Sequence, residues 1–145
     1  MSDTPSEIRD HSMFISKAYG QVLITGLGLG MVTLAAAKKD SVSHVVVLEK
    51  EPHVIALVSQ HLPFQEKITV IQADAFTWKK PKDWAKFDCC WHDIWPDICI
   101  DNLIGMRKLH RRFGRWCSFQ MSWRRSTLEH LAKRAKAEKR YGNYY

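Results

Sequence analysis

The sequence predicts an α/β fold in which a parallel sheet is doubly wound, with helices on both faces. Apolar segments of strand length alternate along the chain with segments of helical periodicity, and this alternation indicates parallel crossover units. A chain of 145 residues that is 46% hydrophobic and 26% charged can form one domain with a substantial core. A glycine-rich stretch, "VLITGLGLGMV" (22–32), joins the first buried strand to a helix. We expect a single domain over 1–145, with about five strands in the order 3-2-1-4-5.

The N-terminal half of the chain is predicted to supply the first three strands. A short helix is expected from Ser6 within an N-terminal arm, residues 1–17, and Gly20 is expected to end it. The following strands are expected at 21–25, 44–50 and 67–74, and the helices between them at 31–39 and 51–62. Pro52 suits the first position of the second of these helices.

The C-terminal half is predicted to continue the alternation with two more strands. A loop with one helical turn (75–86) leads to a strand at 86–94, and a helix at 97–113 ends at Gly114. A fifth strand follows at 115–121. A last helix at 127–140 lies within a basic C-terminal segment, 125–145, whose final "YGNYY" is expected to be frayed.

An uncharged stretch, residues 18–37, is long enough to span a bilayer. Its three central glycines would weaken a helix, however, and a valine- and isoleucine-containing run precedes them while an alanine-rich run follows. The start of the chain is polar and partly acidic, unlike the basic start of a signal peptide. We therefore expect strand, turn and helix here, no membrane segment, and a cytoplasmic protein.

Four cysteines, Cys89, Cys90, Cys99 and Cys117, form no Cys-x-x-Cys pair. Their spacing suggests neither a disulfide framework nor a metal site. Free, mostly buried thiols in a reducing compartment are expected.

The net charge of +7 is unevenly distributed. Residues 1–106 hold 10 lysines and arginines against 13 acids, whereas residues 107–145 hold 12 against 2. This asymmetry fits a nucleic-acid partner, a solvated basic surface, or an interface with the acidic part of a second copy. The candidate phosphate contacts are Arg111, Arg112, Arg115, Arg124, Arg125, Lys133, Arg134, Lys136, Lys139 and Arg140, with Trp116 or Trp123 as stacking partners.

The first two strands end in residues suited to a nucleotide. In open parallel sheets a ligand lies beyond the carboxyl ends of the strands. Gly26, Gly28 and Gly30 follow the first strand and allow backbone N–H groups to approach a ligand, although alone they fit a plain turn equally well. Glu49 ends the second strand about twenty residues later, where a nucleotide pocket places a carboxylate for the ribose hydroxyls. Together they predict a nucleotide pocket.

The third and fourth strands also end in acids. Asp74, followed by Ala75 and Phe76, can contact an adenine edge and ring, or serve only as a turn residue. Asp93 ends the fourth strand and can accept a proton from an amine or a hydroxyl group. His92 beside it fits a structural histidine.

The ordered motifs "VLITGLGLGMV", "VVVLEKEP", "VIQADAF" and "FDCCWHDIW" resemble those of class I S-adenosylmethionine-dependent methyltransferases. Within that superfamily they look most like the spermidine-synthase-like branch, including small phage and prophage members. The resemblance covers about residues 10–121 and implies a Rossmann-like fold that binds S-adenosylmethionine or its decarboxylated form. It assigns Asp93 as the catalytic proton acceptor. The cofactor residues that it implies are Thr25, Gly26, Leu27, Gly28, Gly30, Met31, Glu49, Lys50, Asp74, Ala75 and Phe76.

Three departures from these relatives affect the functional prediction. Methyltransferases often carry an acid where this chain has Thr25, and the fourth-strand acid is followed by "IWPD" (94–97) rather than by the polyamine-synthase or Asn-Pro-Pro-Tyr type of motif. The related sheets have seven strands, so about five strands would make this fold a truncated version. Two functions therefore stay open. One is transfer of a methyl or aminopropyl group to an unidentified acceptor, and the other is cofactor binding without transfer.

The expected fifth strand is too apolar to form an open sheet edge in water. Trp116, Phe119 and Met121, with Trp123 beyond the strand, favour a covering element. We expect a homodimer, or a C-terminal helix folded over that edge.

Overall fold

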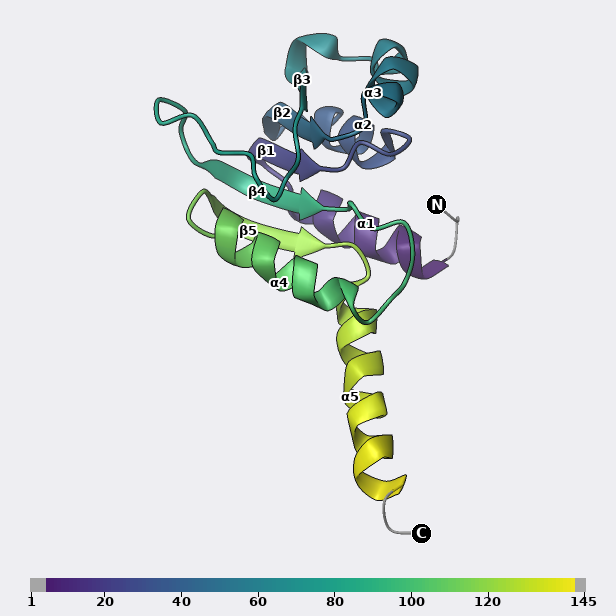
Figure 1. Ribbon diagram of the computed structural model, residues 1–145. Helices are drawn as coiled ribbons and strands as arrows, with labels where there is room; N and C mark the ends of the chain where they lie inside the picture. The colour runs from purple at the N-terminus through teal and green to yellow at the C-terminus, as the bar shows by residue number, and fades with distance from the viewer. Residues whose placement is uncertain (1–4, 143–145) are drawn as a thin grey trace.

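A computed structural model describes residues 5–142 and shows the predicted alternation of strands and helices (Figure 1). The elements are α1 (Pro5–Lys17), β1 (Gly20–Thr25), α2 (Met31–Ala37), β2 (Val42–Glu49), α3 (Pro52–Val58), β3 (Ile68–Gln72), β4 (Phe87–His92), α4 (Asn102–Phe113), β5 (Cys117–Ser122) and α5 (Arg125–Tyr141), with 3₁₀ turns η1 (Ser59–His61) and η2 (Gln65–Lys67). The predicted frayed end falls mostly outside these residues, as does the start of the predicted N-terminal arm.

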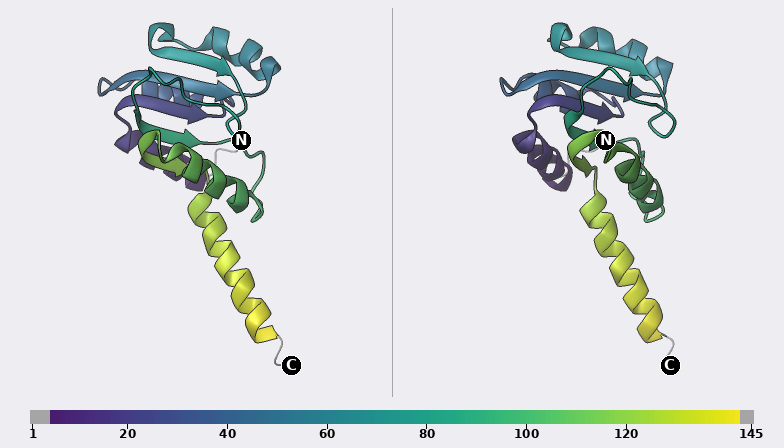
Figure 2. Two further views of the ribbon diagram at one scale, coloured as in Figure 1. Left: turned by 60° about the vertical axis from the view of Figure 1, so that its left-hand side comes forward. Right: turned by 90° about the vertical axis from the view of Figure 1, so that its left-hand side faces the viewer.

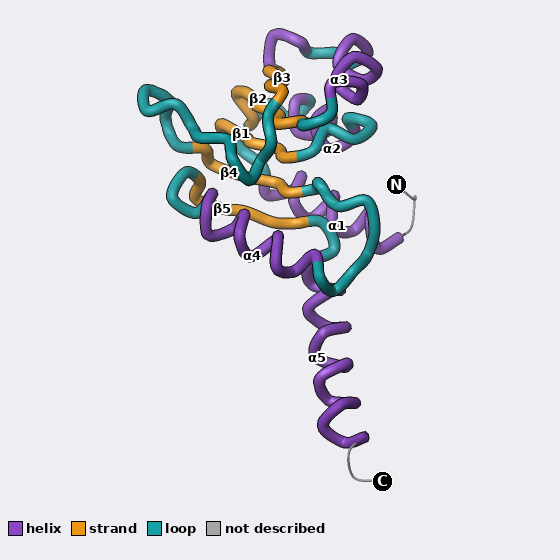
Figure 3. The backbone as a smooth tube through the Cα atoms, in the orientation of Figure 1, coloured by secondary structure: helices purple, strands orange, loops and turns teal. Residues whose placement is uncertain are grey.

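The five strands form one parallel sheet in the order β3-β2-β1-β4-β5, which confirms the predicted topology (Figure 3). Thr25 at the end of β1 lies opposite Leu48 of β2 and His92 of β4. The carboxyl ends of the central strands therefore meet at one edge, and the chain reverses its direction of winding between β1 and β4.

Alternate residues of each strand pack against helices on opposite faces of the sheet. Val22 and Ile24 of β1 face the cluster that contains Phe14 of α1 and Ala36 of α2, with partly buried residues of α3 packed against it. Leu23 between them faces the other side, where it packs with Phe113 of α4. Figure 2 shows α1 and α4 on opposite sides of the sheet.

Two predicted boundaries are wrong for local physical reasons. Gly20 does not end the first helix but begins β1, where its φ of +63° and a virtual Cβ only 2.0 Å from the Asp88 carboxylate require glycine. The helix predicted at 97–113 begins only at Asn102, because residues 97–101 form turns held by a hydrogen bond from the Asn102 side-chain amide to the Asp97 carbonyl. The remaining elements match their predicted positions to within a few residues.

The prediction that a C-terminal helix covers the β5 edge is wrong. Within residues 5–142, helix α5 packs against the body near its start, through the fully buried Leu128 and the partly buried Ala132, and then extends away from the sheet (Figures 1 and 2). Its sequence explains this, because apolar residues beyond Leu128 are few and lysines and arginines predominate. The homodimer alternative stays a prediction.

The uncharged segment 18–37 divides into β1, a glycine turn and α2. Within residues 5–142, no helix combines the length and the apolar character needed to cross a membrane.

Candidate functional site

A cavity of about 610 Å³ lies at the carboxyl ends of the strands, where the sequence places its candidate residues. It brings together eight of the predicted residues, which come from the ends of four different strands: Gly26, Gly28, Glu49, Lys50, Asp74, Ala75, Phe76 and Asp93. Its other lining residues are Leu48, Glu51, Val54, Ala73, Ile94, Trp95, Pro96 and Trp123. The volume lies in the range of sites for nucleotide-sized ligands.

The Glu49 carboxylate is held rigidly at the end of β2. One carboxylate oxygen accepts a hydrogen bond from the Leu27 amide at 2.8 Å, and the other accepts one from the Glu51 amide at 2.9 Å. The residue is only 9% exposed and still lines the cavity. Because each carboxylate oxygen has a second lone pair, Glu49 can still accept hydrogen bonds from two ligand hydroxyl groups.

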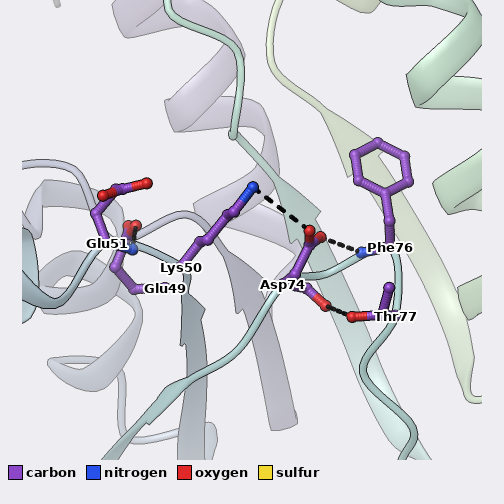
Figure 4. A network of polar contacts seen from close by, with 6 residues as sticks. All are labelled: Glu49, Lys50, Glu51, Asp74, Phe76 and Thr77. Atoms are coloured by element: carbon purple, nitrogen blue, oxygen red, sulfur yellow. Dashed lines mark hydrogen bonds and ion pairs between the residues drawn. The ribbon is translucent and has the colours of Figure 1, made fainter.

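Asp74 organises the turn that follows β3 (Figure 4). Its carboxylate accepts a hydrogen bond from the Phe76 amide at 2.8 Å and lies 3.6 Å from the Lys50 ammonium group. Its carbonyl accepts a hydrogen bond from the Trp78 amide at 2.8 Å. The turn therefore holds Asp74 and the Phe76 ring at the rim of the cavity, and Lys50 links it to the end of β2.

Gly26 allows the ends of β1 and β4 to approach each other. Its φ is +94°, and a Cβ atom there would lie 2.0 Å from the backbone oxygen of Asp93. The Asp93 amide in turn donates a hydrogen bond to the Thr25 carbonyl at 2.8 Å. Glycine is thus required here by backbone conformation and by space, which places Asp93 beside the glycine turn.

The Asp93 side chain lies at the cavity wall and also faces helix α1. His11 of α1 places its Nε2 atom 3.9 Å from the Asp93 carboxylate, and their side chains are 17% and 22% exposed. The His11 ring contacts Trp91 edge-to-face, with centroids 5.5 Å apart. His11 could not be predicted as a site residue, because nothing in the helical pattern of residues 5–17 indicates which face meets the end of β4.

Four predicted cofactor residues lie outside the cavity lining. Thr25 is fully buried, and its hydroxyl group contacts the His92 ring; Leu27 is also buried and contributes its amide to Glu49. Gly30 and the exposed Met31 line a separate depression of about 240 Å³ between α2 and α3. The structure thus separates Gly30 and Met31 from the other predicted residues.

Two tryptophans that line the cavity were not predicted as cofactor or catalytic residues, although Trp123 was a candidate for stacking against a nucleic acid. Trp95 follows β4 and also packs against Leu103 and Met106 under α4. Trp123 follows β5, and its amide donates a hydrogen bond to the His92 carbonyl at 2.9 Å. Inspection of the residues after the fifth strand, by the same strand-end argument, would have identified Trp123.

A chain of buried polar groups runs from β1 to α5, away from the cavity. His92 Nδ1 lies 3.0 Å from the Thr25 hydroxyl oxygen, and His92 Nε2 lies 3.0 Å from the Gln120 side-chain oxygen. Because that oxygen can only accept, Nε2 carries the proton and Nδ1 accepts from Thr25. Burial lowers the pKa of His92 to about 3, so the ring is neutral.

The polar chain continues through α4 into the first turn of α5. The Gln120 amide group donates to the His110 carbonyl at 2.7 Å, and Arg125 donates to the His110 ring at 2.7 Å. Burial, and then the Arg125 cation, lower the pKa of His110 to about 4. Arg125 also pairs with Glu129 at 3.0 Å. Both histidines are therefore neutral groups that hold elements together, as expected for His92.

The fold and the strand-end cavity together define a class I methyltransferase fold. Its similar solved structures include the N-methyltransferase NodS from Bradyrhizobium japonicum WM9, with 17% identity, a TM-score of 0.60, and coverage of 81% of this chain and 66% of that one. They also include the 23S rRNA methyltransferase ErmE, with 18% identity, a TM-score of 0.59, and coverage of 84% of this chain and 47% of that one. NodS has also been solved in complex with S-adenosyl-L-homocysteine.

The particular family follows from the sequence. The family model of the ribosomal RNA adenine dimethylases matches residues 14–114, and the chain belongs to this family. No curated protein sequence matches the chain significantly. The chain spans from about half to two thirds of the length of these two similar structures.

These comparisons confirm the class I superfamily and S-adenosylmethionine as its cofactor. They give no support to the spermidine-synthase-like branch or to a phage origin.

Proposed function

We propose that the chain, as a single domain, is an S-adenosylmethionine-dependent methyltransferase whose acceptor is an adenine in RNA. The observation that carries the proposal is the convergence of three carboxylates, Glu49, Asp74 and Asp93, from the ends of three strands around one cavity. Membership of the ribosomal RNA adenine dimethylase family supports the choice of acceptor.

The residues of the cavity fit the parts of the cofactor. Glu49, with both oxygens fixed by backbone amides, would accept the two ribose hydroxyl groups. Asp74 and the Phe76 ring lie where the adenine edge and face would pack. The turn at Gly26 and Gly28 lets the backbone approach the methionine end.

Asp93 would orient the acceptor and take up its proton. The bound cofactor supplies an electrophilic methyl group on a positive sulfur, so the protein mainly aligns the acceptor nitrogen with it. A carboxylate at the cavity wall can orient an amino group through its N–H bonds and take the proton that the nitrogen loses. Trp95 and Trp123 provide flat apolar surfaces nearby against which a base can stack.

Isothermal calorimetry tests the cofactor part of this proposal. S-adenosylmethionine and S-adenosylhomocysteine should bind more tightly than decarboxylated S-adenosylmethionine. Preference for the decarboxylated form would instead support aminopropyl transfer, and no binding by any of the three would refute the proposal.

Transfer of a labelled methyl group to an RNA hairpin with unpaired adenines tests the acceptor part. Asp93→Asn should keep cofactor affinity and lose transfer, because the amide cannot accept the proton. Cofactor binding without transfer to RNA, DNA or free nucleosides would favour the non-catalytic alternative. Light scattering on the same samples tests the predicted homodimer.

A further inference from the structure

We propose that the outer half of α5 is an arm that binds the phosphate backbone of the acceptor RNA. The proposal rests on the RNA acceptor proposed above and adds the surface that would hold it. It concerns residues 133–140, which lie beyond the last buried residue of the helix.

The inner turns of α5 are anchored to the body. Leu128 is fully buried against Leu103 and Met106 of α4. Arg125 pairs with Glu129 through Nε and donates to the His110 ring through Nη1, so its charge is partly neutralised within the body. This part of the helix is therefore structural.

The outer turns are different, because their charges have no such role. Between residues 133 and 140, Glu138 is the single acid, and lysines and arginines predominate. The exposed cations are Lys133, Arg134, Lys136, Lys139 and Arg140. Within residues 5–142, no ion pair involves any of these five. Lys133, Lys136 and Arg140 follow helical spacing and share one face, over a length of about 10 Å.

Helix α5, which carries the arm, begins beside the candidate active site. Trp123 lines the cavity, and α5 starts two residues later. Trp95 contacts both the cavity and the cluster that contains Leu128. Figure 1 shows α5 leaving the body from the edge where the strands end. A strand of RNA held along α5 would therefore reach the mouth of the cavity.

Charge favours RNA over a second copy of the chain as the partner. Five unpaired cations in eight residues match a polymer that carries one charge per nucleotide. Residues 1–106 of another copy offer a net charge of only −3, spread over the whole body. Contacts to phosphate position a strand without reading its sequence. The arm should therefore bind RNA hairpins of unrelated sequence with similar affinity.

Fluorescence anisotropy with a labelled RNA hairpin tests this proposal on the full chain. The variant Lys133→Gln/Lys136→Gln/Arg140→Gln removes three charges from one face. If each cation neutralises one phosphate of a single strand, the slope of log affinity against log salt should become shallower by about 2. The affinity should also fall at least tenfold at low salt, and calorimetry should show unchanged binding of S-adenosylmethionine.

The matched control is Lys79→Gln/Lys82→Gln/Lys86→Gln, which removes three exposed charges from the loop before β4. The proposal expects the control to bind the hairpin nearly as well as the wild type. It is overturned if the wild type does not bind the hairpin, or if the two triple variants lose equal affinity. It is also overturned if the α5 variant alters only self-association in light scattering, which would assign the arm to a second copy. Cofactor binding is scored separately, so failure of the arm and failure of the cofactor site are distinguishable.

Discussion

The two halves of the sheet use buried polar groups in different ways. In the half formed by β1, β2 and β3, the Glu49 carboxylate is held by backbone amides and faces the cavity. In the half formed by β4, β5 and α5, the Gln120 side chain links the His92 ring to the His110 carbonyl by hydrogen bonds. Neither histidine lines the cavity. The buried carboxylate of the first half therefore presents a ligand site, whereas the buried histidines of the second half connect structural elements. Asp93, Trp95 and Trp123, at the strand ends of the second half, complete the lining of the cavity.

This difference shows that a displaced pKa does not by itself mark an active site. The large pKa displacements among the described histidines are those of His92 and His110, and burial causes both. Perturbed groups often occur at functional sites, but ion and hydrogen-bond networks perturb them as well. Here the direction in which each side chain points, rather than its titration, distinguishes the two halves.

The largest effect should come from Gly26, in the turn after β1, where the two halves of the sheet meet. Gly26→Ala forces a left-handed backbone onto alanine and places Cβ against the Asp93 carbonyl, so we expect a loss of about 3 kcal/mol or more in unfolding free energy. Urea denaturation measures it. Gly142→Ala, where the added Cβ meets nothing within 4 Å, is the control and should change little.

The next effect tests the role of Glu49, in the half formed by β1, β2 and β3, as a cofactor ligand. Glu49→Gln keeps the shape of the side chain, but turns one oxygen that accepts a backbone hydrogen bond into a donor. We expect affinity for S-adenosylmethionine to fall about 30- to 100-fold, the equivalent of about 2 to 3 kcal/mol. Calorimetry measures it, with the exposed Glu66→Gln as control. Unchanged affinity would remove Glu49 from the cofactor site.

A smaller effect tests how far along α5 the helix packs against the body. Leu128→Ala empties a fully buried position, whereas Leu131→Ala changes one that is 39% exposed. We expect the first to lower the unfolding free energy by about 2 kcal/mol and the second by less than about 0.5 kcal/mol. Equal losses would show that the outer turns of α5 pack against the body after all.

The last effect concerns the neutral histidines, and it is the smallest near neutral pH. The folded pKa of His92, about 3, lies below that of an unfolded histidine, so the unfolded chain binds the extra proton as the pH falls below about 6.5. Stability should therefore be fully present at pH 7 and decline by about 1.4 kcal/mol per pH unit below 6 from His92 alone. His110 should lower the stability further in the same direction, and its contribution should stop growing near its pKa of about 4, so its total is smaller.

Urea denaturation between pH 7 and pH 5 measures this slope. His92→Gln should make it shallower, while His53→Gln, at an exposed position, should leave it unchanged. Equal slopes in all three proteins would mean that the pKa of His92 is the same in the folded and unfolded chains, which contradicts its burial as a neutral group.

Much of the ligand half was predictable from sequence because its signals are local. The strand ends place Gly26, Glu49 and Asp74 at one edge as soon as the order of the strands is known. Placement of His11 beside Asp93 depends instead on how a distant helix packs, and periodicity carries no information about that. The course of α5 was mispredicted because a thin apolar stripe does not say where a helix leaves the body.

Within residues 5–142, helix α5 contacts the body near its first turns, and this gives it the geometry of a lever. Its 17 residues span about 25 Å, so a rotation of about 10° at its first turn displaces its tip by about 4 Å. Small changes at the junction of Arg125 with His110 are thereby amplified at the far end of the helix. The same junction continues through Gln120 to His92, so hydrogen bonds connect the base of α5 to the end of β4, one residue before Asp93.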